Sequence, residues 1–326
     1  MAKITYIVEQ YGACAWYRCH TPGMALHERG HDVELGHAPA DGRLAETDVY
    51  VFQRPSRPAS LELIRVANER GGMTVVEMDD DYWNLHPSNP AYGAWKDTPA
   101  VKVLEECTRL AQVVTVSTKE LAEVIRPVNR NVRVLENVLP TQHWPDAPKP
   151  VSREGQVVVG WAGGHAHYPD LQLLSGTVES LLARYENLVV AVAGMEKVPF
   201  RPHERLRFFK ATKIEEYPQL LSRFDIGLAP VVDSRFNRCK SDLKFVEYSM
   251  IGIPSVASRI ATYERTVTHG ENGFLARNPK DWLKHVSRLI ESPELREEVG
   301  LRARALAEAR TIERTVWQWE EAYGLR

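Results

Sequence analysis

The sequence of 326 residues lacks any pair of cysteines at the spacing of a metal site, since its four cysteines are Cys14, Cys19, Cys107 and Cys239. Cysteines this few and scattered form neither a disulfide framework nor a zinc site, and they indicate a reducing, cytoplasmic setting. No apolar run reaches the roughly 18 residues that a transmembrane helix needs. The first ten residues are expected to form a strand rather than a signal peptide.

An excess of charge of either sign is also missing. The chain has 41 Lys and Arg against 43 Asp and Glu, and its formal net charge is -2. This balance gives no global electrostatic footprint for nucleic acid or for an anionic membrane. The basic stretch Arg201–Lys213 contains two phenylalanines and could contact a phosphate backbone, although a solvated sheet edge is the favoured interpretation. DNA is therefore compatible as a partner but not favoured, and the sequence does not indicate an oligomeric state.

Short apolar runs alternate with amphipathic stretches along most of the chain, a pattern typical of parallel sheets covered by helices. The first six expected strands are Lys3–Val8, Asp32–Leu35, Val49–Gln53, Thr74–Met78, Val113–Ser117 and Val132–Glu136. The next five are Gln156–Trp161, Leu188–Ala193, Arg207–Lys210, Asp225–Pro230 and Ser255–Ala257. Between the two sets, residues 140–155 hold four prolines and no usable period, which predicts a hinge.

The sequence therefore predicts an α/β protein of two domains, with residues 1–150 in the first, which includes the hinge, and residues 151–310 in the second. Residues 311–326 are expected to form a terminal helix. Trp317, Trp319 and Tyr323 give this helix an aromatic surface that must dock on something. We expect it to pack back toward the first domain.

One segment has the residues of an anion-binding helix start. Ser241 and Asp242 are expected to cap a helix, with Lys240 at its start and Lys244 within it. A helix N-terminus with two lysines suits a diphosphate. Glu247 shares a helical face with Lys244 and can accept hydrogen bonds from two ribose hydroxyls. On these residues alone, an ordinary surface Lys–Glu pair is the more common explanation.

With its surroundings, this segment resembles the donor-binding part of GT-B glycosyltransferases, in the Lys-x-x-Glu subgroup of the glycosyl transferases group 1 family. The matching stretches, in chain order, are Gly160–Leu171, Asp225–Pro230, Lys240–Tyr248, Gly252–Ser258 and His269–Leu275. The resemblance covers most of residues 156–290. It implies two Rossmann-like domains facing each other across a cleft, with a nucleotide-sugar held mainly by the second domain.

The resemblance also implies roles for individual residues. Lys244 and Lys240 would neutralise the diphosphate, and Glu247 would hold the ribose. The full expected donor-binding set is Lys244, Glu247, Lys240, Ser241, Gly163, Gly164 and His165. Many retaining members carry a second glutamate at the position of Cys239, so this departure leaves the donor sugar open.

The first domain carries a weaker resemblance, in the residues around Tyr17 and Arg18. Arg18 is expected either to reach a phosphate or acceptor across the cleft or to be an exposed arginine at a helix start. Arg54 follows an expected strand, at the end where ligands approach open α/β sheets. No G-x-G-x-x-G motif follows the first strand, which disfavours a dinucleotide dehydrogenase.

Three adjacent carboxylates, Asp79, Asp80 and Asp81, follow the fourth expected strand. Asp79 and Asp81 have the Asp-x-Asp spacing that holds a divalent ion in GT-A glycosyltransferases. Because the GT-B resemblance already supplies lysines for the diphosphate, we expect no metal and no cofactor beyond the donor substrate. Asp80 is the preferred catalytic carboxylate, orienting or deprotonating the acceptor hydroxyl, and Tyr82 and Trp83 suit stacking on a sugar. A solvated strand end, with one aspartate capping the next turn, is the alternative.

These features predict a metal-independent glycosyltransferase that moves a sugar from a nucleotide-diphosphate sugar to a hydroxyl, with retention of configuration preferred. One alternative is a nucleotide-sugar epimerase on the same scaffold. Another is a protein that binds carbohydrate or nucleotide without turnover, which Cys239 allows and Lys244 with Glu247 count against. The sequence leaves the acceptor open among a glycan, a lipid-linked sugar, a protein, a small molecule and a modified DNA base.

Overall fold

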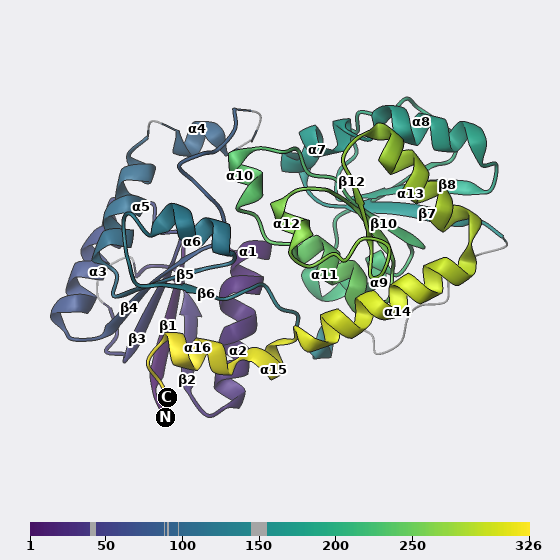
Figure 1. Cartoon of the computed structure of the whole chain (residues 1–326). Helices are drawn as coiled ribbons and strands as arrows, with labels where there is room; N and C mark the ends of the chain where they lie inside the picture. Colours follow the sequence, from purple (N-terminus) through teal and green to yellow (C-terminus); the bar gives the residue numbers. More distant parts are fainter. Residues whose placement is uncertain (40–43, 88, 90, 97, 145–154) are drawn as a thin grey trace.

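The computed structural model describes residues 1–39, 44–87, 89, 91–96, 98–144 and 155–326. Within these residues the chain forms two parallel sheets of six strands each, both flanked by helices (Figure 1). The predicted α/β architecture is confirmed. We call each sheet with its helices the first and the second domain. The domain limits at 150 and 310 stay predictions, and most of the expected hinge at 140–155 lies outside the described residues.

The first sheet has the strand order β2-β1-β3-β4-β5-β6, with all neighbours parallel. Its strands are β1 (Lys3–Val8), β2 (Asp32–Gly36), β3 (Val49–Gln53), β4 (Met73–Met78), β5 (Val113–Val116) and β6 (Val132–Val134). The central strands β3 and β5 are buried along their whole length, as expected for strands covered by helices on both faces. The strand order reverses beside β1, and ligands bind at the carboxyl ends of strands near such a reversal.

The second sheet has the order β12-β11-β10-β7-β8-β9, again parallel throughout. Its strands are β7 (Val157–Ala162), β8 (Leu188–Ala193), β9 (Leu206–Phe209), β10 (Ile226–Ala229), β11 (Ser255–Ser258) and β12 (Phe274–Ala276). The last strand was not among those expected from the sequence. Here the reversal lies beside β7, so its carboxyl end is a natural ligand position.

Helices cover both faces of the first sheet, and their ends follow familiar local signals. α3 and α5 each begin with a proline, and Gly71 follows α3 at φ 79. Thr118 caps α6 by accepting a hydrogen bond from the Leu121 amide at 3.1 Å. The helical segments are α1 (Ala13–Ala15), the π-helical η1 (Trp16–His20), α2 (Thr21–Glu28), α3 (Pro58–Glu69), α4 (Tyr92–Trp95), α5 (Pro99–Leu110), α6 (Lys119–Ile125) and the 3₁₀ turn η2 (Thr141–His143).

The second domain has more helices, several of them a single turn. α14 packs closely against the end of α11. A Cβ added to Gly300 of α14 would lie 2.1 Å from the carbonyl oxygen of Gly252, just past α11. The segments are η3 (His165–His167), α7 (Tyr168–Gln172), α8 (Ser175–Arg184), η4 (Ile214–Glu216), α9 (Tyr217–Leu221), α10 (Arg235–Arg238), α11 (Leu243–Met250), α12 (Ala261–Glu264), α13 (Pro279–Glu291) and α14 (Pro293–Ala309).

The last two helices, α15 (Ile312–Thr315) and α16 (Trp317–Ala322), lie against the first sheet, although the preceding α14 belongs to the second domain (Figure 1). Trp319 and Tyr323 are buried in the core below β1, where the Tyr323 hydroxyl lies 3.2 Å from that of Tyr6. The chain thus crosses between the domains a second time. At this crossing the Leu139 amide donates to Arg310 O at 3.3 Å, and the Ile312 amide donates to Leu139 O at 3.1 Å.

None of the helices in the described part of the chain is both long and apolar enough to span a membrane.

Candidate active site

Lys244, in the first turn of α11, carries a positive charge that its surroundings do not fully balance. Its ammonium donates to the carbonyl of Ala162, at the carboxyl end of β7, and lies 5.2 Å from the centre of the Trp161 ring. Burial lowers the pKa of Lys244, and the nearby charges of Glu247 and Asp170 offset this only in part. Among the described residues no carboxylate lies within salt-bridge distance of it. An incoming anion would supply the missing counter-charge.

The loop after β7 brings backbone close to this ammonium. Gly163 is packed against Gly194, where an added Cβ would lie 2.4 Å from Gly163 O. Gly164 has open space around its Cα, and His165 is exposed. Backbone without side chains at a strand end permits a close approach by a phosphate. Within the described residues, no group of three or more His, Cys, Asp or Glu side chains is placed to hold a metal ion.

Glu247, one turn after Lys244, is buried and bonded across the domain interface. The Tyr17 hydroxyl donates to its Oε1 at 2.7 Å, and the Tyr217 hydroxyl donates to Oε2 at 3.5 Å. Burial raises the pKa of Glu247, while Lys244 and the two tyrosines oppose that rise. Tyr17 comes from η1 of the first domain yet packs in a core cluster of the second. In this structure the carboxylate expected to hold a ribose therefore holds a tyrosine.

Lys240 and Asp80 face each other from opposite domains. The Lys240 Nζ lies 3.3 Å from Asp80 Oδ1 and 3.4 Å from Oδ2, and both side chains are about a quarter exposed. Burial lowers the pKa of Lys240, but the charges of Asp80, Cys14 and Asp79 and the hydrogen bond to Asp80 together outweigh it and leave this pKa raised. Burial also raises the pKa of Asp80, against the opposing effect of Lys240. The preferred catalytic carboxylate thus touches one of the expected diphosphate ligands.

Asp79 differs from its neighbour in its surroundings. The Tyr82 hydroxyl donates to Asp79 Oδ1 at 2.9 Å, and Arg54 Nη1 donates to the Tyr82 hydroxyl at 2.9 Å. Burial raises the pKa of Asp79, but the charge of Arg54 and hydrogen bonds from Cys14 and Tyr82 leave it lowered overall. The charge of Arg54 thus favours the ionised form of Asp79, whereas burial opposes the ionisation of Asp80.

Arg54 is the one non-glycine residue of the described chain with a positive φ, at 48°. It follows β3 directly, and its amide donates to Glu77 O at 3.0 Å. A backbone strained in this way is held by its surroundings and is common at functional sites. Here the strain aims the guanidinium at the hydroxyl of Tyr82 and the charge of Asp79.

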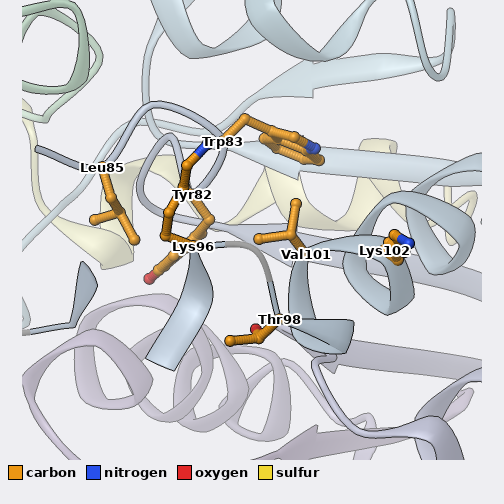
Figure 2. Close-up of a pocket in the computed structure, with 7 residues that line it drawn as sticks. All are labelled: Tyr82, Trp83, Leu85, Lys96, Thr98, Val101 and Lys102. Atoms are coloured by element: carbon orange, nitrogen blue, oxygen red, sulfur yellow. The ribbon is translucent and has the colours of Figure 1, made fainter. Parts of the chain in front are cut away.

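Beyond Tyr82 lies a cavity of about 380 Å³ (Figure 2). Tyr82 and Trp83 line it together with Leu85, Val101 and two lysines. The Tyr82 ring packs against that of Trp95, with centroids 4.2 Å apart and the ring planes tilted by 31°. Tyr82 therefore links the cavity to Asp79, since it lines the cavity and its hydroxyl donates to this carboxylate.

A comparison with known protein families finds a match within the second domain. Residues 156–292 match the family model described as Glycosyl transferases group 1. The second domain is similar to group 1 glycosyltransferase domains. This confirms the family resemblance predicted from the stretches between Gly160 and Leu275. No curated protein sequence matches the chain.

Solved structures resemble the whole chain. Sucrose-phosphate synthase from Thermosynechococcus elongatus superposes with a TM-score of 0.72 at 13% identity, covering 100% of this chain and 99% of that one. HepE of Anabaena, in complex with UDP-glucose, gives a TM-score of 0.70 at 14% identity, with 99% and 100% covered. The catalytic domain of starch synthase IV from Arabidopsis thaliana, bound to ADP and acarbose, gives 0.69 at 9%, with 99% of each chain covered. At such identities the likeness shows the fold, and the predicted GT-B fold is confirmed.

The departure from the group 1 pattern at Cys239 has a structural counterpart. Cys239 is buried, and its thiol lies 3.9 Å from Asp81 Oδ2. Asp81 is fully buried and accepts two hydrogen bonds from Asn84, at 2.8 and 3.1 Å. A glutamate at position 239 would bring a second carboxylate against this one. Asp81 is buried in a turn, which is not the solvated strand end of the alternative, and its role as a catalytic candidate stays a prediction.

Arg18 does not act across the group 1 cleft. Its side chain is 1% exposed, and its guanidinium donates to Glu77 at 2.6 and 3.0 Å, to Leu135 O and to Asn137 Oδ1 at 3.0 Å. The prediction that it reaches a phosphate or acceptor is wrong, because a buried carboxylate on β4 already takes its charge. The alternative of an exposed arginine is wrong as well.

The predicted side-chain cap of α11 is wrong too. Ser241 Oγ accepts a hydrogen bond from Asn137 Nδ2 at 2.7 Å, across the domain interface. The Asp242 carboxylate accepts from Arg310 at 2.6 and 3.0 Å and from the Thr266 hydroxyl. Both side chains therefore anchor the start of α11 to other parts of the chain. The sequence signalled neither Asn137 nor Arg310 for this task, since their partners lie 104 and 68 residues away.

Proposed function

We propose that the protein transfers a sugar from a nucleoside-diphosphate sugar to a hydroxyl of an acceptor, in the cleft between its two domains. The observation that carries this proposal is the desolvated ammonium of Lys244 beside the Gly163–Gly164 loop, in the domain that matches group 1 glycosyltransferases. The structural likeness to HepE in complex with UDP-glucose supports the same class of donor.

In this proposal the diphosphate lies between Lys244 and Lys240, against the backbone of Gly163, Gly164 and His165 and near Ser241. Both lysines are partly buried, so each Coulomb interaction with the diphosphate is stronger than it would be in water. As the bond to the sugar breaks, negative charge grows on the leaving diphosphate, and fixed cations there stabilise the transition state. Glu247 receives the ribose hydroxyls once Tyr17 has moved away.

Asp80 is the proposed carboxylate for the acceptor hydroxyl, because its raised pKa suits a group that takes and gives a proton. Asp79 stays ionised and, with Arg54 and Tyr82, orients that side of the cleft. The diphosphate binds the Lys240 ammonium and so releases Asp80 for this role. The group 1 resemblance favours retention of configuration, with no metal ion.

The donor assignment is tested by a thermal-shift series with nucleoside diphosphates and nucleotide-sugars, with and without EDTA. We expect stabilisation by one base, unchanged by EDTA, amounting to about 2.7 kcal/mol at a ligand concentration of 100 times Kd. Lys244→Ala should abolish this shift, whereas Lys284→Ala, at an exposed lysine on α13, should keep it. A Lys244→Ala protein that is stabilised as strongly as the parent would refute the donor site.

The catalytic assignment has a separate test. Asp80→Asn should bind the donor as the parent does and lose transfer by a factor of about 10² to 10⁴, the usual contribution of a general base. Single-turnover assays with a bound donor would measure this loss. Transfer by Asp80→Asn at the parental rate would move the role to another group.

A second function is favoured by one structural likeness. A putative UDP-N-acetylglucosamine 2-epimerase from Listeria monocytogenes superposes with a TM-score of 0.59 at 11% identity, covering 99% of this chain and 97% of that one. An epimerase needs no acceptor. NMR of the donor incubated alone with the protein separates the two functions, since only an epimerase changes the configuration at one carbon of the sugar without an acceptor.

A further inference from the structure

The cavity beside Tyr82 is adjacent to a second cavity of about 330 Å³, since Trp83, Leu85 and Lys96 line both. We call the two together the mouth groove. At one end its wall is the first turn of α5, with Thr98, Val101 and Lys102 (Figure 2). At the other end its wall is Ser234 and Arg235, at the start of α10 in the second domain. The mouth groove therefore spans the two domains.

Cationic side chains line the mouth groove. Lys96, Lys102 and Arg235 line it, and none of the described residues in its walls is an aspartate or glutamate. All three cations are exposed to solvent. The N-terminal turn of α5 adds a partial positive charge on the same wall. These charges complement an anionic ligand, and lysine and arginine are the usual ligands of phosphate groups.

The remaining walls are aromatic and apolar. Trp83 is half-buried, Leu85 is buried, and the ring of Tyr82 is held in place by its contact with Trp95. Such faces pack on the C–H surface of a sugar or polyol. Volumes of about 380 and 330 Å³ lie in the range of sites for small molecules and are too small for a folded polymer.

The mouth groove adjoins the carboxylates of the cleft through two residues. The hydroxyl of Tyr82 binds Asp79 at 2.9 Å. The side-chain amide of Asn84, in the wall of the second cavity, donates to the Asp81 carboxylate at 2.8 and 3.1 Å. A ligand in the groove thus lies next to the groups proposed to act on the acceptor.

We propose that the mouth groove binds the acceptor, and that this acceptor is a small phosphorylated sugar or polyol. Its phosphate binds to cations at one end of the groove, and its carbon skeleton packs on Trp83, which lines both cavities. The acceptor role rests on the proposed function, whereas the binding of a phosphorylated ligand in the groove does not.

Binding is measured by calorimetry without any donor, so that the result is independent of sugar transfer. The probes are glucose 6-phosphate, glucose 1-phosphate, glycerol 3-phosphate and inositol 1-phosphate, each beside its unphosphorylated parent. At least one phosphorylated probe should bind at least tenfold more tightly than its parent. The double variant Lys102→Gln, Arg235→Gln should weaken that probe by about tenfold or more, since each hydrogen bond to a charged group contributes substantially.

Two controls make the result specific. Lys119→Gln removes another exposed lysine from the first turn of a helix in the same domain and should leave the affinity unchanged. Lys244→Ala should also leave it unchanged, although it abolishes donor binding, which separates the failure of this inference from the failure of the proposed function. Trp83→Ala should weaken phosphorylated and parent probes alike, and Trp83→Phe should restore both.

Three results would overturn the inference. One is the absence of any probe that prefers its phosphorylated form. Another is a preference that survives in the double variant. The third is binding of a single-stranded oligonucleotide that depends on Lys102 and Arg235 while no sugar phosphate binds, which would make the groove a nucleic-acid site.

Discussion

Lys244 is desolvated before any ligand arrives, and this gives donor binding a pH dependence. The ammonium binds a diphosphate only when protonated, and burial lowers its pKa from the ordinary lysine value of 10.5. Affinity for a nucleoside diphosphate should therefore fall as the pH rises through this lowered pKa, by about tenfold per pH unit beyond it. Calorimetry between pH 7 and 10 would show the fall.

Lys244→Arg is the matched variant, because arginine keeps its charge throughout this pH range. The alkaline loss of affinity should be absent in this variant. An identical pH profile for both proteins would assign the titration to another group.

If the donor binds as proposed, its ribose competes with Tyr17 for the Glu247 carboxylate. Tyr17→Phe removes the hydrogen bond to Glu247 at 2.7 Å, and the variant should bind the nucleoside diphosphate about tenfold more tightly, given what hydrogen bonds to charged groups contribute. The variant should also unfold at a lower temperature, because a buried carboxylate loses a partner. Weaker binding by Tyr17→Phe would instead make Tyr17 a residue that positions Glu247 for the ribose.

At the scale of elements, the contact between α14 and the end of α11 depends on Gly300. Gly300→Ala would place a Cβ 2.1 Å from Gly252 O, a backbone atom that cannot rotate away. We expect a loss of about 1–3 kcal/mol, the cost of overpacking, because α14 must shift from α11. Gly176→Ala, in α8, meets nothing within 4 Å and should instead stabilise by about 0.5–1 kcal/mol. Urea unfolding of both variants checks the pair, and equal effects would contradict it.

Sequence alone predicted those strands whose apolar run is long enough to be seen. β1, β3 and β8 lie where the apolar runs lie, at Lys3–Val8, Val49–Gln53 and Leu188–Ala193. β12 was missed because three residues, Phe274–Ala276, form too short a run to be distinguished from a turn. The π-helical η1 was missed because a single wide turn leaves no periodicity in the sequence.

The candidate site was predicted where chemistry is local and missed where it depends on pairing between distant residues. Short motifs singled out Lys240, Lys244 and the Gly163–Gly164 loop, and the structure places Lys244 at the carboxyl end of β7, beside that loop. Their role in donor binding stays a prediction. The burial of Arg18 depends on Glu77, 59 residues away, and the bond from Tyr17 to Glu247 joins residues 230 apart. No local pattern carries such information.

At the scale of the whole molecule, Arg310 joins the two domains at the second crossing. It donates to Asp242 at 2.6 and 3.0 Å and to Asn137 O at 3.0 Å. Arg310→Leu would leave the buried Asp242 carboxylate without its main partner and should destabilise the protein by about 3–5 kcal/mol. Donor affinity should fall as well, because Asp242 anchors the start of α11.

The matched control is Arg302→Leu, on the exposed face of α14. Arg302 pairs with Glu298 at 2.8 Å, four residues away, and such a pair contributes only about 0.3–0.5 kcal/mol. Urea unfolding of both variants would measure the difference. A loss for Arg310→Leu no larger than for Arg302→Leu would show that solvent replaces the interdomain contact.

The two chain crossings, bonded side by side at Leu139 and Ile312, have a mechanical consequence. Two domains joined by one connecting segment can rotate about many axes. Two connecting segments bonded side by side restrict the domains to rotation mainly about the axis through this double connection. In Figure 1 this double connection lies at the opposite end of the interface from α4 and α10. Opening therefore has its longest lever arm at those two helices. A rotation of a few degrees would widen the space between α4 and α10 most and would leave the contacts at the double connection almost unchanged.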